Sequence, residues 1–204
     1  AGHTVNVVIT GSTRGIGRGL AVEFLKRGHD VVVSSRKQAD VDKAVSELAS
    51  TGPARVAGTT CDVTSKADVQ ALWDHAVTSF GRVDFWINNA GRASSRYEVH
   101  EMPEDLVHTL VDGNFKGSVF GSQVAIQGFG KQGSGALYNM LGGSFDGKRL
   151  TPNMGVYSAT KAADWLLTRY LVQENKNPDI IIGAISPGML ITENWFEEQR
   201  QIDP

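Results

Sequence analysis

The amino-acid sequence predicts an α/β protein with a doubly wound parallel sheet, and three observations lead to that fold class. Runs of apolar, β-branched residues alternate with helix-like patterns along the whole chain, which is typical of βαβ units. Several of these runs are apolar throughout, as in strands that helices cover on both faces. The 204 residues, of which 41% are hydrophobic and 21% charged, are enough for one globular domain with a core.

Six short runs predict the strands, because each is rich in apolar and β-branched residues. In chain order they are Val5 to Thr10, Val31 to Ser35, Ala54 to Thr59, Val83 to Asn88, Gly135 to Leu141 and Ile180 to Ile185. Crossovers between parallel strands are right-handed in nearly all proteins. We therefore expect a doubly wound sheet whose ligands bind beyond the carboxyl ends of the strands.

Five segments between the strands carry helical spacing of apolar residues. They are Gly15 to Arg27, Val41 to Ser50, Ser65 to Phe80, Pro103 to Gln132 and Tyr157 to Glu174. The third has a clear start, because Ser65 can cap it and Asp68, three residues later, completes a capping box. The last segment has four aromatic or apolar residues that we expect in the core: Trp165, Leu166, Tyr170 and Leu171.

Composition and charge argue against several classes of partner. A formal net charge of -2 offers no basic surface for nucleic acid or an anionic membrane. The longest apolar runs, such as Ile180 to Ile182, are too short to span a bilayer. The single cysteine, Cys61, cannot form an intramolecular disulfide, and the five histidines show no metal-binding spacing. We therefore expect no nucleic acid, no membrane span and no metal.

The cysteine usage fits a reducing compartment, and the cytoplasm is the expected location. The chain begins at Ala1 without a methionine, so the plastid stroma is the alternative if the N-terminus has been processed.

A glycine-rich turn follows the first strand and opens the first helix. Glycines permit a tight turn and a close approach of the backbone to a phosphate, and a helix N-terminus offers amide hydrogens and a positive dipole to it. The spacing Gly-xxx-Gly-x-Gly differs from the commonest dinucleotide fingerprint, GxGxxG, so a turn without a ligand is the alternative. The candidate cofactor residues here are Gly11, Ser12, Thr13, Arg14, Gly15, Ile16 and Gly17.

The end of the second strand favours NADP over NAD. NAD sites usually place an acid there to hold the ribose 2′-hydroxyl, whereas an arginine accommodates a 2′-phosphate. Here Ser35 and Arg36 end the strand, and no acid follows until Asp40. Arg36 and Arg14 can converge on one phosphate, to which Ser35 can donate a hydrogen bond. The alternative for Arg36 is an ordinary solvated loop cation.

Six motifs in this order resemble those of the short-chain dehydrogenase/reductase family, and the match covers residues 5 to about 195. They are the turn Thr10 to Gly17, the pair Asp62-Val63, the run Asn88-Asn89-Ala90-Gly91, Asn114 in the long helix, the YxxxK motif Tyr157 to Lys161, and Pro187-Gly188 followed by Thr192. The resemblance implies a Rossmann-type sheet with strand order 3-2-1-4-5-6 and a single NADP-binding catalytic domain over residues 1-204.

The resemblance also implies roles for these residues. Asp62 and Val63 would contact the adenine, Asn89, Ala90 and Gly91 would line the cofactor site, and Pro187, Gly188 and Thr192 would hold the nicotinamide end. Lys161 would bind the nicotinamide ribose, and Asn114 would hold a water that links the lysine to solvent.

Tyr157 is the candidate general acid/base. Tyr157 and Lys161 are four residues apart and share one face of a helix. Lowering the pKa of a phenol by roughly 3 units requires about 4 kcal/mol of preferential stabilisation of the phenolate. An adjacent ammonium and an oxidised nicotinamide ring can supply much of it. Tyr157 would then protonate an alkoxide as hydride reaches a carbonyl, or deprotonate an alcohol in reverse.

The family's catalytic serine is missing from its usual place. That position, three residues after Asn139, falls on Gly142, which has no side-chain donor. We expect Ser144, which lies 13 residues before Tyr157, to take the role; the alternative is that Ser144 is a plain loop residue. Losing one such donor would cost roughly 3 kcal/mol of transition-state stabilisation.

Part of the chain is similar to the chlorophyll(ide) b reductase branch of the family. The similar residues are Asn139-Met140 with the glycine-rich loop after them, Thr151-Pro152, Val156-Tyr157 and Ser186 to Met189. That branch would suit a formyl or ketone group on a large apolar substrate. Arg92 and Arg96 can pair with an anionic substituent of the substrate, or they are solvated loop residues.

Family members usually continue through a substrate loop, another helix and a last strand. The chain stops at Pro204, so we expect that loop and the seventh strand to be missing. Family members also commonly pair the helix that carries Tyr157 and the long helix before it with a second subunit, which implies a homodimer or homotetramer.

Three functions follow from this sequence. The first is an NADP(H)-dependent oxidoreductase acting on a small-molecule carbonyl or alcohol. The second is a catalytically silent NADP(H)-binding sensor or scaffold, motivated by the displaced serine. The third is an NADP-binding epimerase or dehydratase.

Overall fold

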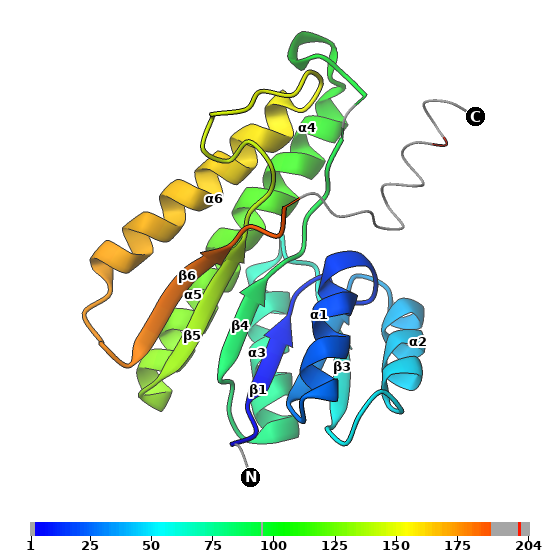
Figure 1. The fold of residues 1–204 in the computed structure, drawn as a ribbon, viewed down its shortest axis with the longest axis vertical. Helices are drawn as coiled ribbons and strands as arrows, with labels where there is room; N and C mark the ends of the chain where they lie inside the picture. Colours follow the sequence, from blue (N-terminus) through cyan, green and yellow to red (C-terminus); the bar gives the residue numbers. More distant parts are fainter. Residues whose placement is uncertain (1–2, 95, 189–199, 201–204) are drawn as a thin grey trace.

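Six parallel strands form the single sheet of the computed structural model, which describes residues 3–94, 96–188 and 200. The strand order is β3-β2-β1-β4-β5-β6, which confirms the predicted doubly wound, Rossmann-type sheet (Figure 1). The strands are β1 (Asn6–Ile9), β2 (Asp30–Ser35), β3 (Val56–Thr60), β4 (Phe85–Asn88), β5 (Gly135–Met140) and β6 (Ile180–Ile185).

Helices cover both faces of the sheet, because successive residues of each buried strand point to opposite sides. The helices are α1 (Gly15–Lys26), α2 (Gln38–Leu48), α3 (Lys66–Phe80), α4 (Glu104–Leu110), α5 (Gly117–Gln132) and α6 (Gly155–Glu174). In β1, Val8 packs into one apolar layer with α3 and α5, while Val7 and Ile9 pack into the other with α1 and α2. None of the helices in the described ranges is both long and apolar enough to cross a membrane.

The start of α3 confirms the predicted cap by Ser65, but the reciprocal half of the capping box is not formed, because the Ser65 amide donates to the Asp62 carbonyl at 3.0 Å instead of to Asp68. Ser65 Oγ accepts a hydrogen bond from the amide of Asp68 at 3.3 Å, and Asp68 Oδ1 accepts one from the Ser65 hydroxyl at 3.0 Å. The second oxygen of Asp68 accepts a hydrogen bond from the amide of Asp62 at 3.0 Å. The cap therefore also fixes the chain just after β3, beyond the carboxyl end of the strand.

The prediction of one helix from Pro103 to Gln132 is wrong. A 3₁₀ turn (η1, Val99–Glu101) precedes α4, and a π-helical segment (η2, Val111–Lys116) separates α4 from α5. Such segments disturb the i→i−4 ladder and re-aim side chains. Here η2 contains Asn114, whose fully buried side chain is hydrogen-bonded to another part of the chain.

The ends of other elements differ from the prediction by one to three residues. The third strand begins at Val56 instead of Ala54, because the carboxylate of Asp30 holds the amide and guanidinium of Arg55 before the ladder starts. The second helix begins at Gln38 instead of Val41.

The expectation that the apolar residues of α6 all lie in the core is wrong. Leu171 packs partly against the core, but Trp165, Leu166 and Tyr170 are 37%, 52% and 59% exposed. Helical periodicity alone assigned these side chains to the core, although α6 lies at the margin of the sheet beside β6 (Figure 1) and leaves the three side chains exposed.

Candidate active site

The turn after β1 and the run after β4 are joined by hydrogen bonds. The Thr10 hydroxyl oxygen accepts hydrogen bonds from the amides of Asn89 and Ala90 at 3.0 and 2.9 Å. The Asn89 side-chain amide donates to the carbonyls of Thr10 and Gly11 at 3.1 and 3.0 Å. A Cβ on Gly11 would lie 2.7 Å from Ala90 Cα, so a glycine is needed for the two segments to approach each other so closely.

A cavity of about 660 Å³ opens beyond the carboxyl ends of β1 to β4. It is lined by twelve of the predicted cofactor residues: Gly11, Thr13, Arg14, Gly15, Ile16, Ser35, Arg36, Asp62, Val63, Asn89, Ala90 and Gly91. Arg92, which the sequence suggested as a substrate contact, also lines the cavity, and sequence reasoning missed the other lining residues, namely Lys37, Asp40, Cys61, Thr64, His108, Thr109, Asp112 and Gly113. The last four come from α4 and η2, and no recognised motif contains them.

Two residues of the predicted turn, Ser12 and Gly17, do not line the cavity, but their contacts hold the backbone of the turn. Ser12 is fully buried, and its hydroxyl donates to the Ile9 carbonyl while its oxygen accepts from the Ser34 amide. A Cβ on Gly17 would lie 2.5 Å from the Asn89 side-chain nitrogen. These two residues therefore determine the backbone conformation of the turn.

The cavity fits a dinucleotide. The N-terminus of α1 faces it, and Gly15 has a φ of 58° with open space where its side chain would be. Amides at a helix N-terminus, together with a missing Cβ, form the kind of cradle that a pyrophosphate needs. The cations Arg14, Arg36 and Lys37 lie along the same wall.

Polar residues that follow β3 also line the cavity. Burial raises the pKa of Asp62, but hydrogen bonds from the hydroxyl and amide of Thr64, with the nearby Arg36 charge, outweigh it and lower the pKa overall. Asp62 is therefore an ionised acceptor at neutral pH. Burial, reinforced by Asp68 and Asp62, raises the pKa of the Cys61 thiol to about 12, so this thiol stays protonated and unreactive.

Ser35 bends the chain at the end of β2. Its hydroxyl donates to the Lys37 carbonyl at 3.3 Å and accepts from the Lys37 amide at 3.4 Å. This local turn directs Arg36 and Lys37 toward the cavity.

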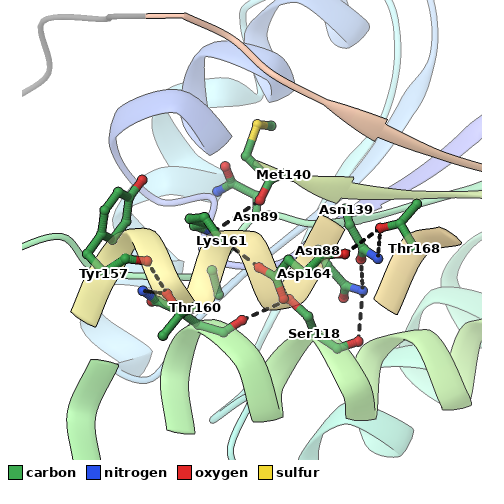
Figure 2. A network of polar contacts seen from close by, with 12 residues as sticks. Asn88, Asn89, Ser118, Asn139, Met140, Tyr157, Thr160, Lys161, Asp164 and Thr168 are labelled. Carbon is green, nitrogen blue, oxygen red and sulfur yellow. Dashed lines mark hydrogen bonds and ion pairs between the residues drawn. The ribbon is translucent and has the colours of Figure 1, made fainter. Parts of the chain in front are cut away.

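Tyr157 and Lys161 lie on α6, and Lys161 is close to Met140 at the carboxyl end of β5 (Figure 2). Lys161 is 5% exposed, and its ammonium donates to the Met140 carbonyl at 3.1 Å. A Cβ on Gly91 would lie 3.7 Å from Lys161 Nζ and 2.9 Å from Asn114 Oδ1. Gly91 thus connects the cofactor cavity to the lysine.

Asn114 ties three parts of the site together. Its side chain accepts from the Arg92 amide at 2.8 Å and donates to the Arg92 carbonyl at 2.9 Å and to the Thr160 hydroxyl at 3.1 Å. The Thr160 hydroxyl in turn donates to the Tyr157 carbonyl at 2.6 Å. The π-helical segment therefore holds the first turn of α6 and the chain after β4.

Gly142 lies against the candidate catalytic phenol. A Cβ on Gly142 would stand 2.0 Å from Tyr157 Oη and 2.8 Å from Cζ. Position 142 is thus the position next to the phenol, and its lack of a side chain leaves the space that the phenol occupies. Ser144 lies two residues further on, half-buried in a turn and with a φ of 65°.

A buried carboxylate that sequence reasoning missed lies one turn beyond the lysine. Asp164 is 0% exposed, and its Oδ2 is 3.5 Å from Lys161 Nζ. Burial raises the pKa of Asp164 to about 6 despite the attraction of Lys161, and burial likewise lowers the pKa of Lys161. An acid at i+3 from the lysine, on the same helix face as Tyr157, is the signal that would have revealed it.

Five candidates from the sequence remain. Pro187 and Gly188 follow β6, half-buried and exposed respectively, and Thr192 lies outside the described residues. Arg92 lines the cavity, whereas Arg96 is exposed on the loop after β4. Within the described ranges, no group of three acidic, histidine or cysteine side chains is arranged to hold a metal ion.

Comparison with known proteins gives consistent matches along the chain. The family model described as short chain dehydrogenase matches residues 5–203. Chlorophyll(ide) b reductase of rice (Oryza sativa subsp. japonica), described as chloroplastic, is 38% identical over an alignment of 194 residues, and the match covers 92% of this chain and 56% of the rice protein. The chain spans from about two-fifths to just over half of the length of the curated chlorophyll(ide) b reductases that it matches.

Two solved structures with bound cofactor show the same architecture. A variant of actinorhodin polyketide ketoreductase with NADPH superposes with a TM-score of 0.88 at 27% identity, over 97% of this chain and 75% of that one. The 3-ketoacyl-(acyl-carrier-protein) reductase of Brucella melitensis with NADH superposes with a TM-score of 0.85 at 26% identity, over 94% and 78%. These structural neighbours bind nicotinamide cofactors of both kinds.

Proposed function

The chain belongs to the short-chain dehydrogenase/reductase family, and from that premise we propose that it is an NADP(H)-dependent oxidoreductase acting on a carbonyl or alcohol. One observation carries the proposal. A dinucleotide-sized cavity with Arg14 and Arg36 on its wall lies beside the pair Tyr157 and Lys161, with Gly91 between them.

The cofactor would lie along the cavity. The amides at the start of α1 would bind the pyrophosphate, Arg14 and Arg36 the 2′-phosphate, and Asp62 and Val63 the adenine. When bound, the nicotinamide supplies or accepts the hydride. Lys161 would bind the nicotinamide ribose, and Pro187, Gly188 and Thr192 the carboxamide end. This domain, residues 1-204, is proposed to act as one unit.

Tyr157 would move the proton. In reduction, its phenol donates a proton to the substrate oxygen, and in oxidation the phenolate accepts one from the alcohol. The charge of Lys161, one helical turn away, would favour the phenolate. Asn114 holds the first turn of α6 through Thr160, so it helps to fix the position of the phenol. Its second proposed role is to hold a water that links Lys161 to solvent. Ser144 is the proposed second hydrogen-bond donor to the substrate.

We propose a large, apolar substrate with a formyl or ketone group. The similarity to rice chlorophyll(ide) b reductase supports this substrate class. Arg92 and Arg96 would meet an anionic substituent of that substrate. If the KM for the true substrate is unchanged in Arg96→Ala, Arg96 makes no contact with the substrate.

Gly142 supports a second candidate function, a silent NADP(H)-binding sensor or scaffold. Position 142 lacks the hydroxyl that would bind a substrate oxygen beside the phenol.

An assay of NADPH oxidation distinguishes the two functions. Wild type and Tyr157→Phe are compared on aldehydes, ketones and a chlorophyll-type formyl substrate, with NADH as the control cofactor. The oxidoreductase predicts NADPH-dependent turnover that Tyr157→Phe abolishes. NADPH binding without turnover of any substrate in the panel supports the silent binder.

A binding experiment tests the choice of cofactor. Arg36→Ala is expected to weaken NADPH binding by about tenfold or more, since it removes a charge-assisted phosphate contact, and to leave NADH binding nearly unchanged. Arg18→Ala is the matched control, because Arg18 pairs with Glu47 on the exposed side of α1. An equal loss for both cofactors in Arg36→Ala would contradict NADP preference.

Two further proposals concern the whole protein. The exposed apolar side chains of α6 support association into a homodimer or homotetramer. The cytoplasm is the proposed compartment, and the chloroplastic rice relative favours the plastid stroma as the alternative.

A further inference from the structure

Asp164 combines complete burial with an incomplete set of partners. It is 0% exposed, and neither carboxylate oxygen has a hydrogen bond from the described residues. Its closest charged group is the ammonium of Lys161, at 3.5 Å from Oδ2 (Figure 2). A buried carboxylate is costly unless it is paired and hydrogen-bonded, so this side chain requires an explanation.

The elements around Asp164 offer it polar but uncharged neighbours. On α5, the Ser118 hydroxyl lies near the carboxyl but donates to the Asn114 carbonyl at 2.9 Å. On α6 itself, the Thr168 hydroxyl donates to the Asp164 main-chain carbonyl at 2.7 Å. On β5, Asn139 bonds Asn88 and Thr168.

The ionisable groups on the other helical elements packed against α6 face one another or are exposed. On η2, Asp112 pairs with Lys116 at 3.2 Å, and on α4 His108 faces Glu104 at 3.6 Å while Asp105 is exposed. Lys161 is thus the charged group in the described part of the chain that acts on the Asp164 carboxyl.

The lysine depends on this carboxylate in return. Its ammonium is buried and hydrogen-bonds to a single carbonyl, that of Met140. Burial lowers the pKa of Lys161, and the Asp164 charge opposes that effect. Lysines buried without a counter-charge can lose their proton at neutral pH. A neutral lysine would have no charge with which to favour a phenolate.

We propose that Asp164 is a positioning residue that keeps Lys161 protonated and directs its ammonium between the Met140 carbonyl and the face of α6 that carries Tyr157. The three side chains stand at i, i+4 and i+7 of one helix, so they share a face over two turns. Asp164 acts through Lys161 and does not touch the substrate. The consequence for the phenol rests on the function proposed above.

The test follows the titration of Lys161 in the full chain without cofactor, by NMR of carbon-labelled lysine. Asp164→Asn is expected to lower the titration midpoint of Lys161 by at least about 1 pH unit, since it removes a charge at contact distance. Glu174→Gln, which removes one negative charge from the exposed end of the same helix, is expected to leave that midpoint in place. An unchanged or raised midpoint in Asp164→Asn would overturn the proposal.

The ultraviolet absorbance of tyrosinate reports the effect on the phenol. For each protein, the Tyr157 signal is isolated by subtracting the spectrum of its Tyr157→Phe counterpart. The proposal predicts that tyrosinate appears at higher pH in Asp164→Asn, because Lys161 has lost its charge. A shift to lower pH would mean that the lysine remains charged and that Asp164 merely repels the phenolate, which would also overturn the proposal.

A second variant keeps the test decisive if Asp164→Asn does not fold. Coupling between two sites is reciprocal, so Lys161→Met should raise the titration midpoint of Asp164, followed with carbon-labelled aspartate, by a similar amount. A midpoint that does not move would overturn the proposal. None of these measurements requires turnover, so a failed NADPH assay with intact coupling refutes the proposed function alone.

Discussion

Single residues in this site are constrained by contacts that come from distant parts of the chain. Gly142 lies just after β5, and Tyr157 lies in the first turn of α6. The phenol of Tyr157 occupies the space that a Cβ on Gly142 would need. The neighbouring Gly143 has no heavy atom within 4 Å of its own missing Cβ. Two adjacent glycines therefore have different roles, and a serine at position 142 would displace the phenol unless the phenol rotates away.

Gly142→Ala is expected to lower kcat of the NADPH-dependent reaction by about ten- to a hundredfold, because its Cβ displaces the phenol by an ångström or more. Affinity for NADPH should stay the same, since Gly142 does not line the cofactor cavity. Steady-state kinetics and NADPH titration check both values. Gly143→Ala is the matched control and should keep its activity; equal kcat values for the two variants would refute this role of Gly142.

Asp164 should also make stability depend on pH. Its pKa is about 6 in the folded protein against an ordinary value of 3.8, so the folded state binds more protons than the unfolded state between these values. Its contribution to the free energy of unfolding is therefore fully present below pH 3.8 and is lost as pH rises through about 6, by at most about 3 kcal/mol. Chemical denaturation of wild type and Asp164→Asn across this window measures it. A constant difference between the two proteins would contradict the raised pKa.

At the scale of elements, the start of α3 links stability to the cofactor site. The Ser65 cap holds Asp68, and Asp68 holds the amide of Asp62 at the cavity wall. The π-helical segment η2 has a similar part, because its Asn114 holds Arg92 and Thr160. Helix ends and irregular turns, more than helix centres, therefore position the residues around the cavity.

Ser65→Ala should lower the free energy of unfolding by about 1 kcal/mol, the usual cost of losing an N-cap. It should also weaken NADPH binding, because Asp68 loses one of the groups that hold it toward Asp62. Denaturant titration and NADPH titration measure the two effects. Thr78→Ala, at an exposed position of the same helix, is the control and should not be destabilised. A Ser65→Ala variant as stable as this control would refute the cap.

At the scale of the whole molecule, the parallel sheet brings the motif residues together, since the carboxyl ends of all its strands lie at one edge. The cavity and α6 share this edge, while the outer face of α6 exposes Trp165, Leu166 and Tyr170. Apolar side chains collected on one helix face are typical of a surface that another chain covers.

Leu166→Glu should convert the proposed homo-oligomer to a monomer, because a carboxylate buried without a partner opposes association. Analytical ultracentrifugation measures the mass. Ala49→Glu, which adds the same charge at an exposed site after α2, should leave the assembly intact. A wild-type protein that sediments as a monomer would refute association through this helix face.

The sequence by itself determined the order of strands and helices, the cap of α3 and the composition of most of the cofactor cavity. These features depend on local hydrophobic periodicity, on turn chemistry and on motifs at the ends of strands, all of which can be read within short windows. The tertiary structure alone decided three others: the π-helical segment around Asn114, the contact between Gly142 and Tyr157, and the burial of Asp164 beside Lys161. Each of these depends on what packs around a residue from elsewhere in the chain, and that packing sets the space and the dielectric environment in which a side chain acts.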